Sequence, residues 1–524
     1  MDFRELGVFV RSASFELINN DIYHAPAPYS VYLDGRETGG ERRRNVFSVY
    51  GLLPDTEYRL EVRAADGGRA ERRFRTREES FRLNVRSFGA AGDGRTPDTN
   101  AVQAAILACP ENGTVWFPKG VYLTAPLFLK SRTTLELDEG ATILGMADRS
   151  AYPILPGVTV SANEKDEYYL GIFEGNPLDS YASLLTGIGV RDVDITGLGT
   201  VDANAGAGDW WREPKKKHGA WRPRMLFLNR CENVRVQGVT FQNSYAWTLH
   251  PWLSAGVGLL DIRIVNDPDS PNTDGIDVES CRGVDIVGAR ISVGDDCIVL
   301  KSGKMYLGEK LHRPTSDVSI RNCLLERGHG AVVIGSEVSA GVGGVFARQC
   351  LFSGTDRGLR VKTRRGRGRA SVVDGIRCRD IRMENVTAPF VINMFYFCDP
   401  DGHSEFVWSK EKLPADEFTP RVGRLSCENI RCVGCGTAGM YFYGLPEMPI
   451  DEIVMRHISI SFSPDAEPGY PAMMDHIEPV CKLGGFAANV RRLVLDDVAV
   501  EGYEREKFVL LNVPDLEQKE RGND

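Results

Sequence analysis

The stretch Val190-Arg191-Asp192-Val193-Asp194-Ile195 is the first of a series of short segments that resemble one another. Val193 and Ile195 alternate with Asp192 and Asp194, which is the pattern of a half-buried strand. Similar β-branched alternations follow polar turns later in the chain, at Val234-Arg235-Val236, Val284-Asp285-Ile286, Val318-Ser319-Ile320, Ile376 to Met383 and Val490 to Leu495. The steps between the first four segments are of the size, roughly 20 to 50 residues, that is typical of solenoids and propellers.

The turns that enter these segments also repeat, as Cys231-Glu232-Asn233, Cys281-Arg282-Gly283 and Cys427-Glu428-Asn429. Such repetition is expected where equivalent residues of successive coils stack in ladders. The region has no propeller signature and almost no helical periodicity. From about Phe81 onward the sequence therefore predicts an all-β solenoid. One helix is expected over Ala101 to Cys109, after the N-cap group of Pro97-Asp98-Thr99-Asn100, where it would cover the open end of the first coil.

The first eighty residues read as a small β-sandwich. Tyr58, Leu60 and Val62 alternate with charged residues, and turn signals recur at short spacing. The segment from Leu53 to Tyr58 resembles the tyrosine corner of fibronectin type III domains. We therefore predict two domains, a fibronectin type III-like β-sandwich over residues 1–79 and the solenoid over residues 80–524. A packing or spacer role is the simplest one for the sandwich.

Composition excludes several classes of protein. The chain has 524 residues, 42% of them hydrophobic and 26% charged, which is ordinary for a globular protein and excludes disorder and collagen. The net charge of −9 argues against a nucleic-acid partner. No apolar run is long enough to span a membrane, and the start, from Met1 to Glu5, lacks the features of a signal peptide. We expect a soluble, cytoplasmic protein without a membrane partner, and mostly buried thiols among its 12 cysteines.

Four polar clusters interrupt the solenoid pattern, Asn272-Thr273-Asp274-Gly275, Gly294-Asp295-Asp296, Gly328-His329-Gly330 and Arg360-Val361-Lys362. Asp274 and Asp295 are 21 residues apart, about one coil, and the two later gaps each fit one coil with a longer loop. Since adjacent strands lie ~4.8 Å apart, stacking would bring the three carboxylates together on one face.

Crowded carboxylates cannot all ionise easily, so one should keep a proton and serve as an acid while another stays ionised as a base. That division is what a glycosidase needs. Arg360 and Lys362 would project from one face of a strand, where they could bind a substrate carboxylate. His329 between glycines could tune a neighbouring carboxyl. Asx turns are the alternative for each aspartate cluster alone, a calcium site is the alternative for the set, and the run Arg364, Arg365, Arg367 and Arg369 is either a solvated loop or an extension of the positive patch.

The ordered set Asn-Thr-Asp, Gly-Asp-Asp, Gly-His-Gly and Arg-x-Lys resembles glycoside hydrolase family 28, the polygalacturonases. The segments from Phe88 to Gly94 and from Val115 to Tyr122 are also similar to that family. The resemblance implies a right-handed parallel β-helix. The amino-terminal sandwich followed by a β-helix, together with Asn393-Met394-Phe395-Tyr396-Phe397, is similar to bacterial exo-acting members, in which extra loops close one end of the cleft.

The resemblance also implies roles for individual residues. Asp295 would be the general acid, Asp274 and Asp296 would activate the attacking water, and His329 would maintain the protonation of the acid. A single displacement by water would invert the anomeric centre. The residues expected to bind substrate are Asn272, Trp247, His250, Arg360, Lys362 and Tyr396. The last of these stays open, because the late tyrosine of the family matches Tyr396, Tyr441 or Tyr443 equally well.

The implied activity is inverting, exo-acting hydrolysis of α-1,4 bonds in short galacturonides, in the cytoplasm and without a metal or other cofactor. Within the family the alternative is another pectic linkage, such as that of rhamnogalacturonan or xylogalacturonan. Two alternatives come from other classes of protein, a pectate lyase and a non-catalytic carbohydrate-binding β-helix.

Overall fold

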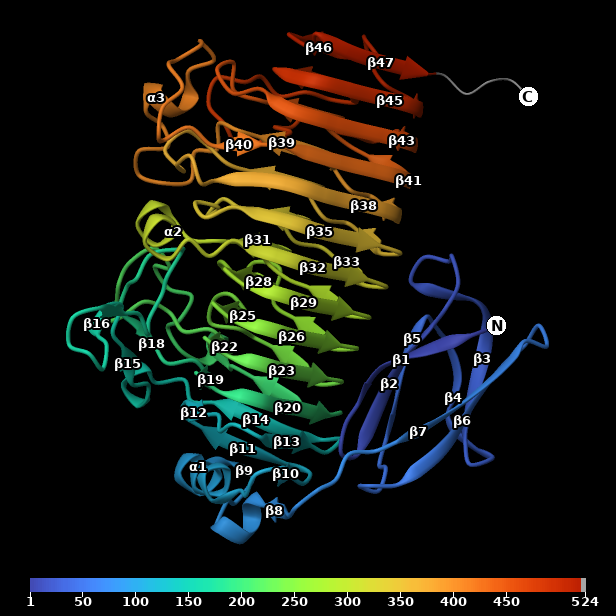
Figure 1. Ribbon diagram of the computed structural model, residues 1–524, viewed down its shortest axis with the longest axis vertical. Coiled ribbons are helices and arrows are strands. Elements are labelled where there is room, and N and C mark those ends of the chain that lie inside the picture. The colour runs from blue at the N-terminus through green and yellow to red at the C-terminus, as the bar shows by residue number, and fades with distance from the viewer. Residues whose placement is uncertain (520–524) are drawn as a thin grey trace.

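The computed structural model of the protein describes residues 1–519, and it has two parts (Figure 1). The larger is a right-handed parallel β-helix, and the smaller is an antiparallel sandwich that packs against its side. The predicted all-β fold is therefore confirmed. The last sandwich strand ends at Arg75 and the first β-helix strand begins at Arg82, so the predicted boundary after residue 79 falls in the connecting segment.

Most coils of the β-helix contribute a long strand, a short strand and a strand of a separate third face. In the later coils the single strands β38, β41, β43 and β45, of 12 or 13 residues, take the place of the long and short strands. The long strands form one ribbon of a 24-stranded sheet: β8 (Arg82–Asn84), β10 (Gly113–Phe117), β13 (Thr133–Leu137), β20 (Arg191–Gly197), β23 (Glu232–Gln237), β26 (Ala255–Leu260), β29 (Arg282–Val287), β32 (Thr315–Arg321), β35 (Val342–Arg348), β38 (Val372–Glu384), β41 (Arg424–Cys435), β43 (Ile450–Phe462), β45 (Val490–Glu501) and β47 (Asp515–Lys519). The short strands continue the same sheet: β9 (Asp93–Pro97), β11 (Gly120–Thr124), β14 (Ala141–Gly145), β21 (Thr200–Asp202), β24 (Thr240–Gln242), β27 (Arg263–Val265), β30 (Arg290–Ser292), β33 (Leu324–Glu326), β36 (Leu351–Ser353) and β40 (Arg421–Val422).

The third face is a parallel sheet of 12 strands. Its strands are β12 (Leu127–Phe128), β19 (Leu185–Ile188), β22 (Leu226–Asn229), β25 (Leu249–Trp252), β28 (Ile276–Glu279), β31 (Asp296–Lys301), β34 (Gly330–Ile334), β37 (Arg357–Lys362), β39 (Ala388–Asn393), β42 (Ala438–Tyr443), β44 (Leu483–Ala488) and β46 (Val509–Leu511). Longer excursions carry two small hairpin pairings, β15 (Ile154–Leu155) with β18 (Ser180–Tyr181) and β16 (Thr159–Val160) with β17 (Glu167–Tyr168), and the helices α2 (Met305–Leu311) and α3 (Glu405–Trp408).

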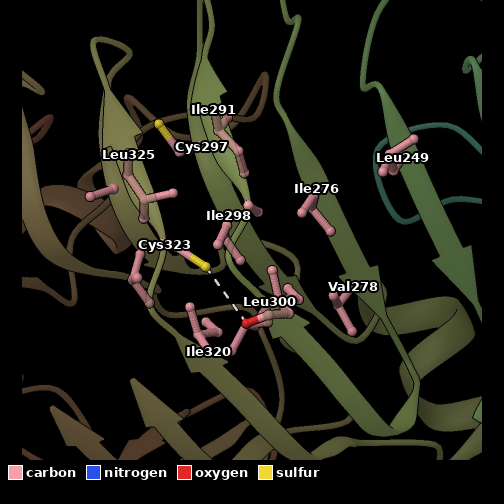
Figure 2. Close-up of a cluster of buried hydrophobic side chains, with 14 of the residues drawn as sticks. Leu249, Ile276, Val278, Ile291, Cys297, Ile298, Leu300, Ile320, Cys323 and Leu325 are labelled. Atoms are coloured by element: carbon pink, nitrogen blue, oxygen red, sulfur yellow. Dashed lines mark hydrogen bonds between the residues drawn. The ribbon is translucent and has the colours of Figure 1, made fainter. Parts of the chain in front are cut away.

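The core lies inside the coils, where apolar side chains of the three faces meet. Figure 2 shows Ile276 and Val278 of β28, Ile298 and Leu300 of β31 and Ile320 of β32 converging in this space. Strand register stacks equivalent residues of successive coils into columns. One column runs through Leu135, Ile195, Val236, Leu259, Ile286, Ile320, Ala347, Cys378, Cys427, Met455 and Leu495.

The turns after Cys231 and Cys281 bend the chain at the entrance to β23 and β29, whereas Cys427-Glu428-Asn429 lies inside β41, so the expectation that it enters a strand is wrong. Asn233 and Gly283 both adopt left-handed backbone, with φ of 53° and 68°, a conformation that asparagine and glycine accept more readily than other residues. The cysteines beside these turns point into the coil. The 12 cysteines, all within the described residues, carry free thiols, and ten of them are buried, as predicted.

The predicted helix closes the amino-terminal end of the solenoid as α1 (Thr99–Ala108), with Val102, Ala105 and Ile106 buried against the first coil. The Asp98 carboxylate does not cap this helix. It accepts hydrogen bonds from the N–H groups of Ala91 and Gly92 at 2.6 and 3.0 Å, and so fixes the preceding turn. No helix within residues 1–519 is long and apolar enough to cross a bilayer.

The sandwich consists of the sheets β1-β2-β5 and β4-β3-β6-β7. Its strands are β1 (Phe3–Val8), β2 (Ser12–Leu17), β3 (His24–Leu33), β4 (Arg36–Arg44), β5 (Val46–Tyr50), β6 (Glu57–Ala64) and β7 (Arg69–Arg75). The Tyr58 hydroxyl accepts a hydrogen bond from the Leu53 N–H at 2.8 Å, which is the contact of a tyrosine corner.

Polar contacts tie the sandwich to corners of the β-helix coils. Glu16, which is 2% exposed, accepts hydrogen bonds from Arg321 Nε at 3.1 Å and Asn322 Nδ2 at 2.7 Å. Arg44 pairs with Asp261 at 2.8 Å. In Figure 1 the sandwich lies on the opposite side of the solenoid from α2 and α3.

Candidate active site

The predicted site residues meet on the outer face of the 12-stranded sheet, at β28, β31, β34 and β37. Asp274 lies two residues before the start of β28, Asp296 begins β31 and His329 directly precedes β34. Asp296 is in register with Gly330, and Val333 is in register with Arg360. The four clusters therefore lie on successive coils, as their spacing predicted.

The three aspartates form one carboxylate cluster. One carboxylate oxygen from each of Asp274, Asp295 and Asp296 lies within 4.8 Å of the other two. Asp274 and Asp296 are buried, whereas Asp295 is partly open to solvent. Because the cluster is held by strand register on two neighbouring coils, its members cannot move apart without disturbing the sheet.

Asp296 is neutralised by the two predicted cations. Lys362 Nζ donates to Asp296 Oδ2 at 2.7 Å, and Arg360 Nη1 donates to Oδ1 at 3.3 Å. Burial by itself would raise the pKa of Asp296, but Lys362 and Arg360 outweigh it and lower that pKa from 3.8 to about 2. Asp296 is thus the ionised member of the cluster at neutral pH.

Asp274 is in the opposite electrostatic situation. Its burial, with the nearby carboxyls of Asp277 and Asp295, raises its pKa well above the ordinary value. Within the described residues its Oδ1 atom has no hydrogen-bond partner. The cluster therefore places a carboxyl that favours its proton beside one that favours ionisation. The carboxyl that favours its proton is Asp274, whereas the resemblance implied Asp295 as the acid.

His329 lies at the open side of the cluster. Its Nδ1 is 3.3 Å from Asp295 Oδ1, and its side chain is 54% exposed. The hydrogen bond to Asp295 raises the pKa of His329, against the opposing effect of partial burial. A proton on His329 is therefore favoured by the carboxylate that it faces.

Asn272 is held in place by a buried arginine that the sequence analysis missed. Asn272 has left-handed backbone with φ of 57°. Arg222 Nη2 donates to Asn272 Oδ1 at 2.6 Å, and Arg222 Nη1 donates to the Pro271 carbonyl at 2.8 Å. Arg222 thus fixes the turn that carries Asp274. Arg222 lies in the long excursion before β22, and the sequence of this excursion has no periodic pattern that would have indicated its position.

The cluster opens into a cavity of about 510 Å³ that is continuous with solvent. Its walls combine carboxylates, lysines and two aromatic side chains: Glu174, Lys215, Trp247, Asn272, Asp274, Asp295, Asp296, Lys301, Lys304, Ser336, Glu337, Lys362, Tyr396, Cys398 and Asp399. Trp247, Asn272 and Tyr396 therefore border the cavity, as expected. Of the three candidate tyrosines only Tyr396 does so, since Tyr441 and Tyr443 pack against Phe486 farther along the sheet.

The expectation that His250 lines the cleft is wrong. Its side chain is completely buried, with Nε2 at 2.9 Å from Glu279 Oε2. Burial, with the charges of Arg224 and Lys301, lowers the pKa of His250 well below its usual value. His250 lies on the far side of Trp247, whose ring packs against it edge to face at 5.0 Å between centroids. In the sequence, a histidine before Pro251 looks like a residue that lines the cleft. Only the packing shows that His250 is buried instead.

Three of the four arginines after Lys362 belong neither to a solvated loop nor to a free positive patch, whereas Arg369 is exposed. Arg364, Arg365 and Arg367 are buried and paired with carboxylates. Arg367 Nη1 lies 2.8 Å from Asp399 Oδ2, and Arg365 Nε lies 2.6 Å from Glu447 Oε1. The pairs of Arg364 with Asp401 and of Arg367 with Asp399 attach the loop that carries Tyr396 to the body of the solenoid.

Lys301 and Glu337 are further cavity residues that the sequence analysis missed. Lys301 Nζ is 3.0 Å from Glu337 Oε2 and 4.1 Å from the centre of a Trp247 ring. Lys301 could have been noticed as the one charge that ends the apolar run Cys297 to Leu300. Glu337 follows a glycine-serine turn and carries no such signal.

A hard cation would have to use the same three aspartates. Lys362 and Arg360 already satisfy both oxygens of Asp296, and their charges repel a cation at this position. The donor set therefore suits proton transfer better than metal binding.

Sequence comparisons find similar families over the β-helix. Residues 149–405 match the family described as "Glycosyl hydrolases family 28", and residues 82–146 match the one described as "Rhamnogalacturonase A/epimerase, pectate lyase-like". A probable polygalacturonase of Vitis vinifera is 31% identical over 327 residues, which cover 60% of this chain and 63% of that protein, or less than two thirds of its length. The exo-poly-alpha-D-galacturonosidase of Dickeya chrysanthemi is 26% identical over 447 residues, which cover 76% of this chain and 73% of that protein.

Two solved structures are similar over most of the chain. The family 28 exopolygalacturonase of Yersinia enterocolitica has a TM-score of 0.73 at 19% identity, with 98% of both chains covered. The hyperthermoactive exopolygalacturonase of Thermotoga maritima has a TM-score of 0.63 at 27% identity and covers 81% of this chain and 93% of that one. The first likeness extends over both the sandwich and the β-helix.

Proposed function

We propose that the chain, whose residues 149–405 match glycosyl hydrolases family 28, hydrolyses α-1,4 bonds between galacturonate residues of pectic oligosaccharides. The observation that carries the proposal is the cluster of Asp274, Asp295 and Asp296 beside Arg360 and Lys362 at the cavity. The carboxylates supply acid and base, and the cations suit an acidic sugar. The names of the similar plant and bacterial proteins support galacturonan as the substrate.

In the mechanism that we propose, Asp295 donates its proton to the glycosidic oxygen, because it is the partly open member of the cluster and faces His329. Asp296, which stays ionised, and Asp274 orient the attacking water. One oxygen of each carboxyl lies within 4.8 Å of the other two, so a proton that Asp274 favours in the free protein can pass within the cluster to Asp295.

Single displacement by water is the stereochemical course that we propose. The cluster is narrower than the 6.5–9.5 Å separation usual in inverting glycosidases, since its oxygens lie within 4.8 Å. A water therefore has to bind over the pair Asp274 and Asp296, not between acid and base. Proton NMR of the first product anomer tests this step, and a product that retains the α configuration would contradict it.

Exo action is favoured by a wall at one end of the cavity. The segment around Gly175 packs against Glu337, and the Lys304 N–H donates to the Gly175 carbonyl at 3.0 Å. This contact joins the excursion before β19 to the start of α2. A chain end suits a cavity with such a wall better than the middle of a polymer does.

We also propose a fibronectin type III-like identity for the sandwich and a cytoplasmic location for the protein. The sheet orders and the Tyr58 contact support the first proposal. The free thiols are compatible with a reducing compartment, which supports the second. Fractionation of cells that express the full natural gene tests the location, and recovery of the protein outside the cytoplasm would contradict it.

The activity is tested by product analysis of the purified protein with trigalacturonate and with long polygalacturonate, in the presence of a chelator. Early release of saturated monomer or dimer from both substrates is the expected result. A ladder of intermediate sizes would make the action endo, and unsaturated products that depend on calcium would identify a lyase. Absence of turnover on both substrates would favour another pectic linkage or a binding role.

A further inference from the structure

Glu337 is a charged side chain of the cavity to which neither acid-base chemistry nor carboxylate binding assigns a role. It follows β34, is 7% exposed and borders the same cavity as Asp295 and Asp296. One of its carboxylate oxygens accepts from Lys301 Nζ at 3.0 Å. The other oxygen has no hydrogen-bond partner within the described residues, and it is not fully buried.

The surroundings of Glu337 keep it ionised. Burial by itself would raise its pKa, but Lys301, Lys304 and Arg367 outweigh burial and lower that pKa. An ionised carboxylate is a hydrogen-bond acceptor only, and it forms stronger hydrogen bonds than a neutral group does. Glu337 therefore repels a substrate carboxylate and attracts hydroxyl groups.

Glu337 also lies against one wall of the cavity. A Cβ atom added at Gly175 would lie 2.9 Å from Glu337 Cγ and from the Lys304 nitrogen, so the wall is in direct contact with the Glu337 side chain. Another sugar cannot pass between these groups without displacing the wall. A sugar that binds beside Glu337 therefore meets this wall.

We propose that Glu337 accepts hydrogen bonds from free hydroxyls of the non-reducing terminal galacturonate, and so selects that end of the chain. The inference rests on the proposed function and deepens it. In a 1,4-linked chain every internal sugar uses its 4-hydroxyl in a bond, so neighbouring free 3- and 4-hydroxyls occur only at the non-reducing end. With its hydroxyls toward Glu337, the terminal sugar can direct its carboxylate toward Arg360 and Lys362.

The test compares three substrates: trigalacturonate, the same trimer reduced to the alditol at its reducing end, and a trimer with a 4,5-unsaturated non-reducing end, which lacks the 4-hydroxyl. We expect the native protein to cleave the first two alike. We expect its kcat/KM on the unsaturated trimer to be lower by roughly ten- to a hundred-fold, as for the loss of a hydrogen bond to a charged group. Equal rates on saturated and unsaturated trimers would overturn the inference.

Glu337→Gln should raise KM for trigalacturonate and bring the ratio of kcat/KM on the two trimers close to one. A purely structural role through Lys301 would lower kcat on both trimers and leave the ratio unchanged, which would overturn the inference. Glu337→Asp keeps the charge but withdraws it by one methylene. This variant should therefore lose the discrimination between the saturated and unsaturated trimers, while its melting temperature stays native. If Glu337→Asp still discriminated between the two trimers, that result would contradict the inference.

Glu447→Gln is the matched control, because Glu447 is a buried carboxylate paired with Arg365 outside the cavity. It should keep the native ratio between the trimers. Failure of the native protein to cleave trigalacturonate at all would refute the proposed function itself. Normal cleavage with an unchanged ratio in Glu337→Gln would refute only the role of Glu337.

Discussion

Lys362 donates a hydrogen bond to Asp296, with 2.7 Å between Nζ and Oδ2. The two residues are 66 positions apart in the chain, and both side chains are almost fully buried. In the free protein Lys362 therefore compensates the negative charge of Asp296. We expect a substrate carboxylate to share this cation during binding, which would couple binding to the charge of Asp296.

Lys362→Met should move the acidic limb of the pH profile to higher pH. Asp296 has its pKa lowered to about 2 by Lys362 and Arg360, so it stays ionised through acid pH. Without Lys362 that pKa should rise by about one unit or more, and the base should be lost at correspondingly higher pH. The measurement is kcat/KM on trigalacturonate from pH 3 to 8. An acidic limb at the native position would show that Lys362 does not control Asp296.

Asp295→Asn should lower kcat on the order of 10³-fold without unfolding the protein, because general acid catalysis contributes about 10² to 10⁴. Asp295 is partly exposed, so an isosteric amide should leave the melting temperature close to native. Asp317→Asn, at an exposed corner of the long sheet, is the control and should keep the native kcat. A native rate in Asp295→Asn would refute the assigned acid.

His329 should govern the alkaline limb of the profile. Its pKa is raised above 6.5 by Asp295, so the favourable interaction is complete below about pH 6.5 and is lost as pH rises through the higher folded-state value. His329→Gln should lower kcat and remove this limb. The readout is kcat against pH, and an unchanged alkaline limb in the variant would exclude His329 as its source.

Arg321→Met should destabilise the protein by about 1 to 3 kcal/mol at pH 7, because it leaves Glu16 buried with fewer partners. Arg321 and Arg4 outweigh burial and lower the pKa of Glu16. The contribution of Glu16 is therefore present above about pH 4.5 and is lost as pH falls through the lower folded-state value.

Denaturant unfolding at pH 7 and at acid pH measures this difference, which should shrink in acid. Arg424→Met removes a comparable but exposed pair with Asp374 and should change the stability by less than about 1 kcal/mol. Equal losses in the two variants would contradict a specific role of the sandwich contact. Activity on trigalacturonate at 25 °C should be native in Arg321→Met, because this residue contacts the sandwich and not the cavity.

The solenoid was predictable because its information is local and repeated. The alternation of Val193 and Ile195 with aspartates indicates which face of the strand is buried, and later coils repeat this pattern. Because side chains of a strand alternate between its two faces, Arg360 and Lys362 lie on the same face, where both contact Asp296. Motif spacing of about one coil was enough to predict that the aspartates meet.

Residues of the excursions were not predictable in this way. Arg222 reaches Asn272, and the wall around Gly175 reaches Glu337, through segments that have no period. Their sequence therefore does not indicate which coil they cover. His250 shows the same limit inside a strand, since the alternation places it on the outer face but does not reveal that Trp247 and Glu279 cover it there.

By itself, the sequence determined the strand pattern, the order of the motifs and the types of charged residue that meet at the site, because these depend on residue type and on short spacing. Only the tertiary structure decided which tyrosine borders the cavity, where the cavity ends and which carboxyl keeps its proton. Those properties depend on distances and burial between residues on different coils, and such distances exist only after the coils have stacked and the excursions have folded back over them.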